Sequence, residues 1–194
     1  MPTKRPCTQT RKGLKNFKDR VTVFLCANIT GNDKLKPILI GKSEKPRAFK
    51  GFSSGSYIQY EGSKKAWMTT FLFNKWIKQW DQKLRAEKRK ICLVVDNCTS
   101  HKILNSLSNI EVIFLSPNTT SVLQPMVPGI IKNFKAYFNG YKLSHISDMI
   151  DGVKPPRDCF KSINLRDVAV FTSLSWKKVT KKTIYNRFSH SGWI

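Results

Sequence analysis

An aspartate placed directly after an apolar run is the first residue of this chain that could do chemistry. Ile91 to Val95 is apolar throughout and ends at Asp96, which is followed by the short polar stretch Asn97–His101. Such a run predicts a strand buried on both faces. A carboxylate at the C-terminal end of that strand is costly to bury alone and is typical of the mouth of a site. The alternative is that this polar stretch, through Thr99 and Ser100, only caps the next helix.

The cysteines and histidines do not predict a structural zinc site. Such a site needs four clustered ligands, and Cys98 and His101 have no second pair at a suitable spacing, since the other histidines are His145 and His190. The Cys98–His101 stretch is therefore predicted to be a helix-start turn. The chain has five cysteines with no C-x-x-C pair, which favours reduced thiols over disulfides.

A second polar stretch follows the next apolar run. It reads Pro117-Asn118-Thr119-Thr120-Ser121 and continues to Gln124-Pro125-Met126-Val127-Pro128-Gly129. Together the two stretches resemble the catalytic core of the Tigger/pogo-type DDE transposases, a group that includes Jerky-like proteins and centromere protein B. The resemblance runs in order from about residue 16 to the C-terminus. Further matching pieces are Asp19–Thr22, Cys26–Asn28, Gly41–Ser43, Pro46–Phe49 and Lys64–Thr69.

The resemblance implies a chemistry that this chain cannot complete. DDE enzymes use three carboxylates to hold two divalent metals about 4 Å apart. Asp96 corresponds to the second acid, the third position is Val127, and the first acid belongs upstream of Met1. Asp148 and Asp151 cannot replace the third acid, because twenty helical residues span roughly 30 Å. We therefore expect Asp96 to be a vestigial, weak metal ligand, the ancestral Mg²⁺ site to be lost, and endonuclease activity to be absent.

The patterns around these motifs predict an α/β fold. Strands are expected at Val21–Ile29, Leu35–Ile40, Tyr57–Tyr60, Ile91–Val95 and Glu111–Leu115, the first two as a hairpin and the last two as a parallel unit. Helices are expected after Thr69 or Thr70, from Pro128 to His145, and after Asn164, with residues 152–158 as a linker. The first helix should bury a stripe of Phe73, Trp76, Ile77, Trp80 and Leu84, and the last one Leu165, Val168, Ala169 and Leu174.

The resemblance makes this fold a ribonuclease-H-like mixed sheet flanked by helices. In that fold the first strand is central and carries the first acid. We expect the sheet to be truncated at that strand, and the family's helix-turn-helix DNA readers to be missing too. Open sheet edges then favour self-association or a partner protein.

Charge is the strongest compositional signal, since 35 Lys and Arg face 12 acids and give a net charge of +23. We expect a basic arm at residues 1–20, a partial transposase core at 21–150 and a helical basic tail at 160–194. Such a surface attracts nucleic acid, DNA first and without sequence preference. The expected contacts are Lys12, Lys15, Lys177, Lys178, Lys181 and Lys182. No apolar run of about 18 residues or secretory signal is present, so we expect a nuclear protein without a membrane span.

The predicted function is that of a catalytically degenerate, transposase-derived nucleic-acid-binding protein. Two alternatives stay open, because charge does not exclude them: a protein-interaction module built on a dead transposase core, and a decayed fragment without a selected role. An active DDE endonuclease has the least support, because of Val127.

Overall fold

A hairpin and one further strand form the first sheet of the computed structural model, which describes residues 20–104, 106–116, 124–150 and 156–194. Strand β1 (Thr22–Phe24) pairs antiparallel with β2 (Ile38–Gly41), which confirms the predicted hairpin. Strand β3 (Gln59–Gly62) then pairs parallel with β2, so the order is β1-β2-β3. The connection between β2 and β3 holds two short 3₁₀ turns, Arg47–Phe49 and Ser54–Ser56.

The second sheet has two parallel strands. Strand β4 (Ile91–Val95) pairs with β5 (Ile110–Phe114) in the register Ile91 to Ile110, which confirms the predicted parallel unit. The described part of the connection between them contains one 3₁₀ turn, Thr99–His101, where a short helix was predicted. The prediction that β4 is buried on both faces is wrong on the outer face, where Cys92 is exposed and Ile113 of β5 is 43% exposed.

Helix α1 (Thr70–Ala86) joins the two sheets through one hydrophobic core. Its N-cap is Thr69, whose side chain accepts a hydrogen bond from the Leu72 N–H. The predicted stripe is confirmed: four of its side chains are buried and Trp80 is packed against them. This core also takes Ile38 and Ile40 from the first sheet and Leu93 and Val95 from the second.

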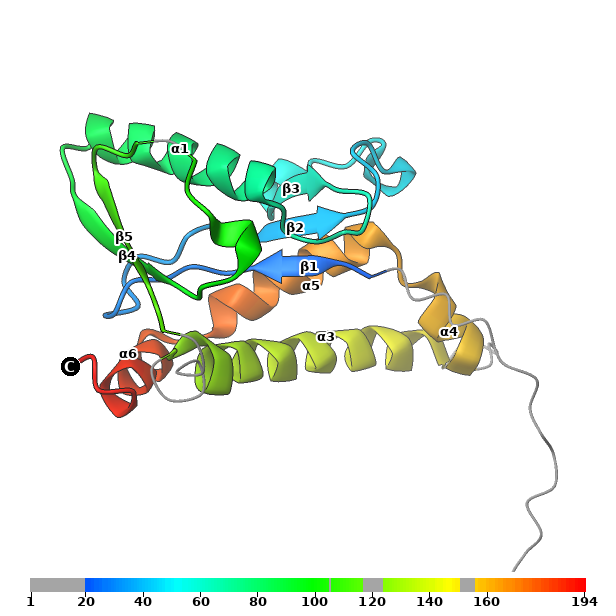
Figure 1. The fold of residues 1–194 in the computed structure, drawn as a ribbon. Coiled ribbons are helices and arrows are strands. Elements are labelled where there is room, and N and C mark those ends of the chain that lie inside the picture. Colours follow the sequence, from blue (N-terminus) through cyan, green and yellow to red (C-terminus); the bar gives the residue numbers. More distant parts are fainter. Residues whose placement is uncertain (1–19, 105, 117–123, 151–155) are drawn as a thin grey trace, which may run out of the picture.

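The other face of the first sheet is covered by the C-terminal helices. Figure 1 shows α1 on one side of the strands and α3 and α5 on the other. Alternation along the strands explains this, because successive side chains point to opposite faces. Phe24 and Ile38 pack in the α1 core, whereas Val23 and Leu39 contribute to the clusters under α5 (Leu165–Lys178).

The helices at the C-terminal end differ from the predicted ones at their boundaries. A π-helical segment, η4 (Met126–Ile131), runs into α3 (Lys132–Ile150), so Pro128 lies inside the helical stretch and is not its first residue. Helix α4 (Pro156–Ser162) occupies part of the predicted linker. A further helix, α6 (Lys181–His190), follows α5 within residues 160–194, where a helical basic tail was predicted.

Asn164 caps α5 as predicted, in a capping box with Asp167. Ala169 of α5 is fully buried, but the prediction that Leu174 points inward is wrong, since it is 37% exposed. The buried positions of this helix also include Phe171 and Trp176. Among the described helices, none combines the length and the apolarity needed to cross a membrane.

Candidate functional site

Asp96 lies directly after β4, where the strand leaves the core. Its Oδ1 is 2.5 Å from Nδ1 of His101, which sits at the end of the 3₁₀ turn that follows. The same imidazole nitrogen is 3.3 Å from the main-chain oxygen of Asp96. The His101 ring packs on Phe73 of α1, with 4.5 Å between ring centroids. The turn therefore folds back and places an imidazole beside the carboxylate.

Cys98 completes a group of three potential ligands. Its Sγ, a ring nitrogen of His101 and a carboxylate oxygen of Asp96 all lie within 4.8 Å of one another, and each residue is partly buried. The Cys98 sulfur is also 2.9 Å from the hydroxyl of Ser100. The sequence predicts only a helix-start turn for this stretch. The D-x-C-x-x-H spacing signals three potential ligands, whereas a structural zinc site requires four.

Two side chains of α1 hold the turn in place. The Thr70 hydroxyl donates to the Thr99 carbonyl at 3.1 Å. The buried amide of Asn74 donates to the Lys102 carbonyl at 2.8 Å and accepts from the Leu104 N–H at 2.9 Å. A hollow of about 440 Å³ opens beside the turn and is lined by Asn97, Cys98, Thr99, Lys102, Ile103 and Phe114.

The predicted nucleic-acid contacts are only partly described. Lys12 and Lys15 lie outside the described residues. Lys177, Lys178, Lys181 and Lys182 are exposed and come together where α5 ends and α6 begins. Lys178 is not free, because its ammonium lies over the rings of Tyr137 and Tyr141 of α3, at 5.3 and 5.7 Å from their centroids.

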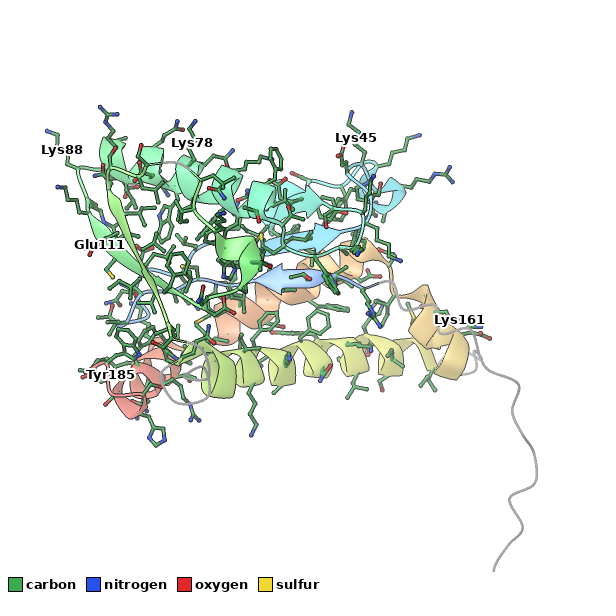
Figure 2. All side chains as sticks on the ribbon, viewed as in Figure 1. Lys45, Lys78, Lys88, Glu111, Lys161 and Tyr185 are labelled. Carbon is green, nitrogen blue, oxygen red and sulfur yellow. The ribbon has the colours of Figure 1, made fainter. Side chains whose placement is uncertain are left out.

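The other three lysines of this corner are available for ligands. In the described part of the chain the ammonium groups of Lys177, Lys181 and Lys182 have no ion pair or hydrogen bond. The N-cap of α6 is Thr180, and no acid lies in the first turn of this helix. The N-terminal end of α6 therefore adds a partial positive charge to the same corner. Figure 2 shows other lysines, among them Lys45, Lys78 and Lys161, also directed outward.

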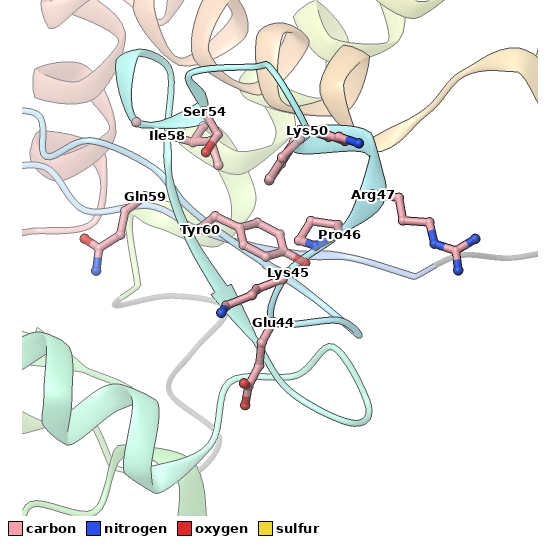
Figure 3. Close-up of a pocket in the computed structure, with 11 residues that line it drawn as sticks. Glu44, Lys45, Pro46, Arg47, Lys50, Ser54, Ile58, Gln59 and Tyr60 are labelled. Carbon is pink, nitrogen blue, oxygen red and sulfur yellow. The ribbon is translucent and has the colours of Figure 1, made fainter.

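A second hollow, of about 690 Å³, lies between β3 and the segment that precedes it. Its wall carries the cations Lys45, Arg47 and Lys50 against one acid, Glu44. The ring of Tyr60 lies beside Pro46 in this hollow (Figure 3), and its hydroxyl donates to the Ser43 carbonyl at 2.7 Å. Burial raises the pKa of Tyr60. This hollow offers cations around an apolar floor and no second carboxylate for acid–base or metal chemistry.

The position of Val127 is within η4, and the structure describes no side-chain environment for it. Four other acids bear on whether Val127 has a substitute, and the structure describes two of them. Asp33 pairs with Arg89 at 2.9 Å, Asp148 is exposed on α3, and Asp19 and Asp151 are outside the described residues.

Comparison with known proteins places this chain in a family. A family model described as DDE superfamily endonuclease matches residues 18–188. Tigger transposable element-derived protein 4 of Mus musculus is 33% identical over 178 residues, covering 92% of this chain and 34% of that relative. CENP-B homolog protein 2 of Schizosaccharomyces pombe is 30% identical over 206 residues, covering 99% and 39%. ARS-binding protein 1 of the same yeast is 28% identical over 204 residues, covering 99% and 38%.

The chain thus spans between 34% and 39% of the length of these relatives. No solved structure matches.

Proposed function

Because this chain belongs to the DDE superfamily endonuclease family, we propose that it is a transposase-derived protein of the nucleus that binds DNA and does not cut it. DNA binding is inferred mainly from the lysine corner, the cluster of Lys177, Lys181 and Lys182 at the α5–α6 junction. These three lysines have no acidic partner among the described residues. One relative's name, ARS-binding protein 1, also states a binding role.

The loss of catalysis rests on Val127. In this family's motif the residue after Gln-Pro-Met is the third acid, and an isopropyl side chain cannot coordinate a cation. Each Mg²⁺ of a two-metal site requires several oxygen ligands. The groups beside Asp96 are a thiol and an imidazole, which Mg²⁺ does not favour. The residues present therefore do not fit two Mg²⁺ ions, and no reaction step is assigned to them.

The binding is expected to be electrostatic and indifferent to sequence. Lysines neutralise phosphates and release counterions, which lowers log affinity by about 0.9 per contact for each unit of log salt. The corner presents its ammonium groups at a helix N-terminus, where backbone N–H groups also attract phosphate. The cations around the Tyr60 hollow extend the positive surface to a second place on the molecule.

Fluorescence anisotropy across a salt series tests this function with two unrelated duplexes. We expect equal affinities for both and a steep slope of log affinity against log salt. Changing Lys177, Lys181 and Lys182 together to Ala should reduce that slope by up to about 3. The matched control changes Lys78, Lys83 and Lys90, exposed lysines in and after α1, and should leave most of the slope in place. A flat salt response in the unaltered chain contradicts DNA binding.

Cleavage is tested separately with supercoiled plasmid and Mg²⁺ or Mn²⁺. We expect the plasmid to remain intact with the unaltered chain and with Asp96→Ala. Nicking that disappears in Asp96→Ala would show an active metal site and overturn the loss of catalysis.

A second candidate function is protein interaction through sheet edges. In the described residues β1 pairs on one side with β2, and β4 pairs on one side with β5, so each strand keeps an unpaired edge. This is the arrangement that a ribonuclease-H-like sheet interrupted between β1 and β4 would have. Unpaired edges recruit strands from other chains. Light scattering over a range of concentrations should then show dimers or larger species, and a constant monomer mass would exclude this role.

A further inference from the structure

Three side chains of different chemistry converge after β4. A carboxylate oxygen of Asp96, the Sγ of Cys98 and a ring nitrogen of His101 lie within 4.8 Å of one another, and no other group of three such residues is found in the described ranges. Zinc binds nitrogen at about 2.0–2.1 Å and sulfur at about 2.3 Å, so its tetrahedral ligand atoms stand about 3.3–3.7 Å apart, and small side-chain movements bring these three atoms to that spacing.

The carboxylate of Asp96 and the imidazole of His101 are in direct contact. The Oδ1 of Asp96 is buried without a hydrogen bond of acceptable geometry among the described residues, although Nδ1 of His101 is 2.5 Å away. Two electronegative atoms this close must share a proton or a positive ion. Two ligands of one tetrahedral zinc ion stand about 3.3 Å apart, so a small outward shift of the ring from its contact with the carboxylate makes room for the ion.

The turn that carries these ligands is held in its conformation by α1. Thr70 and Asn74 bind the carbonyls of Thr99 and Lys102, and Phe73 supports the imidazole ring. Ser100 lies at hydrogen-bond distance from the Cys98 sulfur, where its hydroxyl can donate to a thiolate. Outer contacts of this kind orient the ligands of metal sites before the metal binds.

The donor set selects the metal. Imidazole nitrogen, thiolate sulfur and one carboxylate oxygen suit Zn²⁺ or Co²⁺, whereas Mg²⁺ requires oxygen ligands in a near-octahedral shell. We propose that Asp96, Cys98 and His101 bind one Zn²⁺ ion, in a site where the family motif accounts for Asp96 as a metal ligand but not for Cys98 or His101. Three protein ligands leave the fourth position of the metal to water or to an anion. An anion can enter from the adjoining hollow, which Lys102 helps to line. This pattern is that of an open zinc site.

Cobalt titration of the metal-free protein tests the site directly, because Co²⁺ reports thiolate coordination by a charge-transfer absorption in the near ultraviolet. We expect one equivalent to bind with that absorption, Zn²⁺ to displace it and excess Mg²⁺ to leave it unchanged. Cys98→Ser should abolish the absorption. His101→Ala should weaken binding at least about tenfold, because loss of even an outer contact of a metal site costs about 10–100-fold in affinity.

The matched controls remove the same functional groups elsewhere. Cys92→Ser changes an exposed thiol of β4, Cys7→Ser changes a thiol outside the described residues, and His190→Ala changes an exposed imidazole on α6. All three should bind Co²⁺ as the unaltered chain does. An unaltered chain without the absorption, or an absorption that survives Cys98→Ser, overturns the site. Neither result bears on DNA binding, which the lysine variants test independently. If Cys98→Ser fails to fold, the melting temperature in the presence of Zn²⁺ is measured instead. A Zn²⁺-dependent rise that is present in Cys92→Ser and absent from His101→Ala supports the site. No Zn²⁺-dependent rise in the unaltered chain overturns it.

Discussion

The ammonium group of Lys34 lies against the C-terminal end of α5 and over the indole ring of Trp176. It donates to the carbonyl of Trp176 at 2.9 Å and to that of Val179 at 2.7 Å, and it is 5.2 Å from the indole centroid. The indole N–H in turn donates to the Leu35 carbonyl at 2.9 Å. The hairpin loop after β1 therefore stabilises the end of α5, and α5 stabilises the loop in turn. Burial lowers the pKa of Lys34, yet the helix end favours its charge.

Lys34→Met should lower the free energy of unfolding by about 2 kcal/mol, because the helix carbonyls lose their donor. Lys36→Met is the matched control. Its ammonium donates once, to the exposed Gly55 carbonyl at 2.7 Å, so its loss should cost less than about 1 kcal/mol. Urea unfolding of both variants measures the difference. Equal midpoints would mean that Lys34 does not hold α5.

Gly31 should not tolerate alanine. Its φ is +68°, and a Cβ atom there would lie 2.8 Å from the Cα of Lys181 in α6. The left-handed backbone costs an alanine roughly 1–2 kcal/mol, and the close approach to main chain adds to this. Gly51 has φ +71° with open space around it, so Gly51→Ala should show the backbone cost alone. Thermal unfolding compares the two variants. Similar melting temperatures would show that the contact with α6 does not add to the cost of Gly31→Ala.

Two buried polar residues of α1 should have separable effects. Asn74 binds the turn that carries His101, whereas Asp81 accepts the N–H groups of Ser108 at 3.1 Å and Asn109 at 2.7 Å. Replacing either with Ala leaves buried groups unpaired and should cost about 2–3 kcal/mol. Hydrogen exchange distinguishes them. Amides of residues 99–104 should exchange faster in Asn74→Ala, and those of 108–110 in Asp81→Ala; the reverse pattern would contradict these contacts.

Stability should fall as the pH becomes alkaline, partly through Cys26. Burial first, and then the Asp33 carboxylate, raise the pKa of this thiol from 9.0 to about 12. The unfolded chain thus releases the proton at lower pH than the folded chain. Folding holds this proton, so its stabilising contribution is complete below pH 9.0 and is lost as the pH rises toward about 12.

Melting temperatures from neutral to about pH 10 should therefore fall less steeply for Cys26→Ala than for the unaltered chain. Cys92→Ala is the control, since it removes an exposed thiol and leaves the core intact. Parallel curves for the unaltered chain and Cys26→Ala would show that the thiol titrates alike in both states.

The sequence alone determined the local elements and the family motifs. Ile91–Val95 is a strand, Phe73, Trp76, Ile77 and Leu84 form a buried helical stripe, and Asn164 begins a helix with a capping box. These features depend on residues a few positions apart, whose periodicity and capping chemistry are visible in the letters themselves. The motif spacing likewise identified the family and Val127.

Tertiary structure alone decided which distant groups meet. Lys34 and Trp176 are 142 positions apart, and no periodicity connects them. Leu174 fits the apolar stripe of α5 but is exposed, because the packing of α3 and the sheet selects which face of the helix is covered. Asp96, Cys98 and His101 are close in sequence, yet their convergence depends on Thr70, Phe73 and Asn74 of α1, which hold the turn. The sequence supplies the three potential ligands, and the long-range contacts with α1 bring them close together.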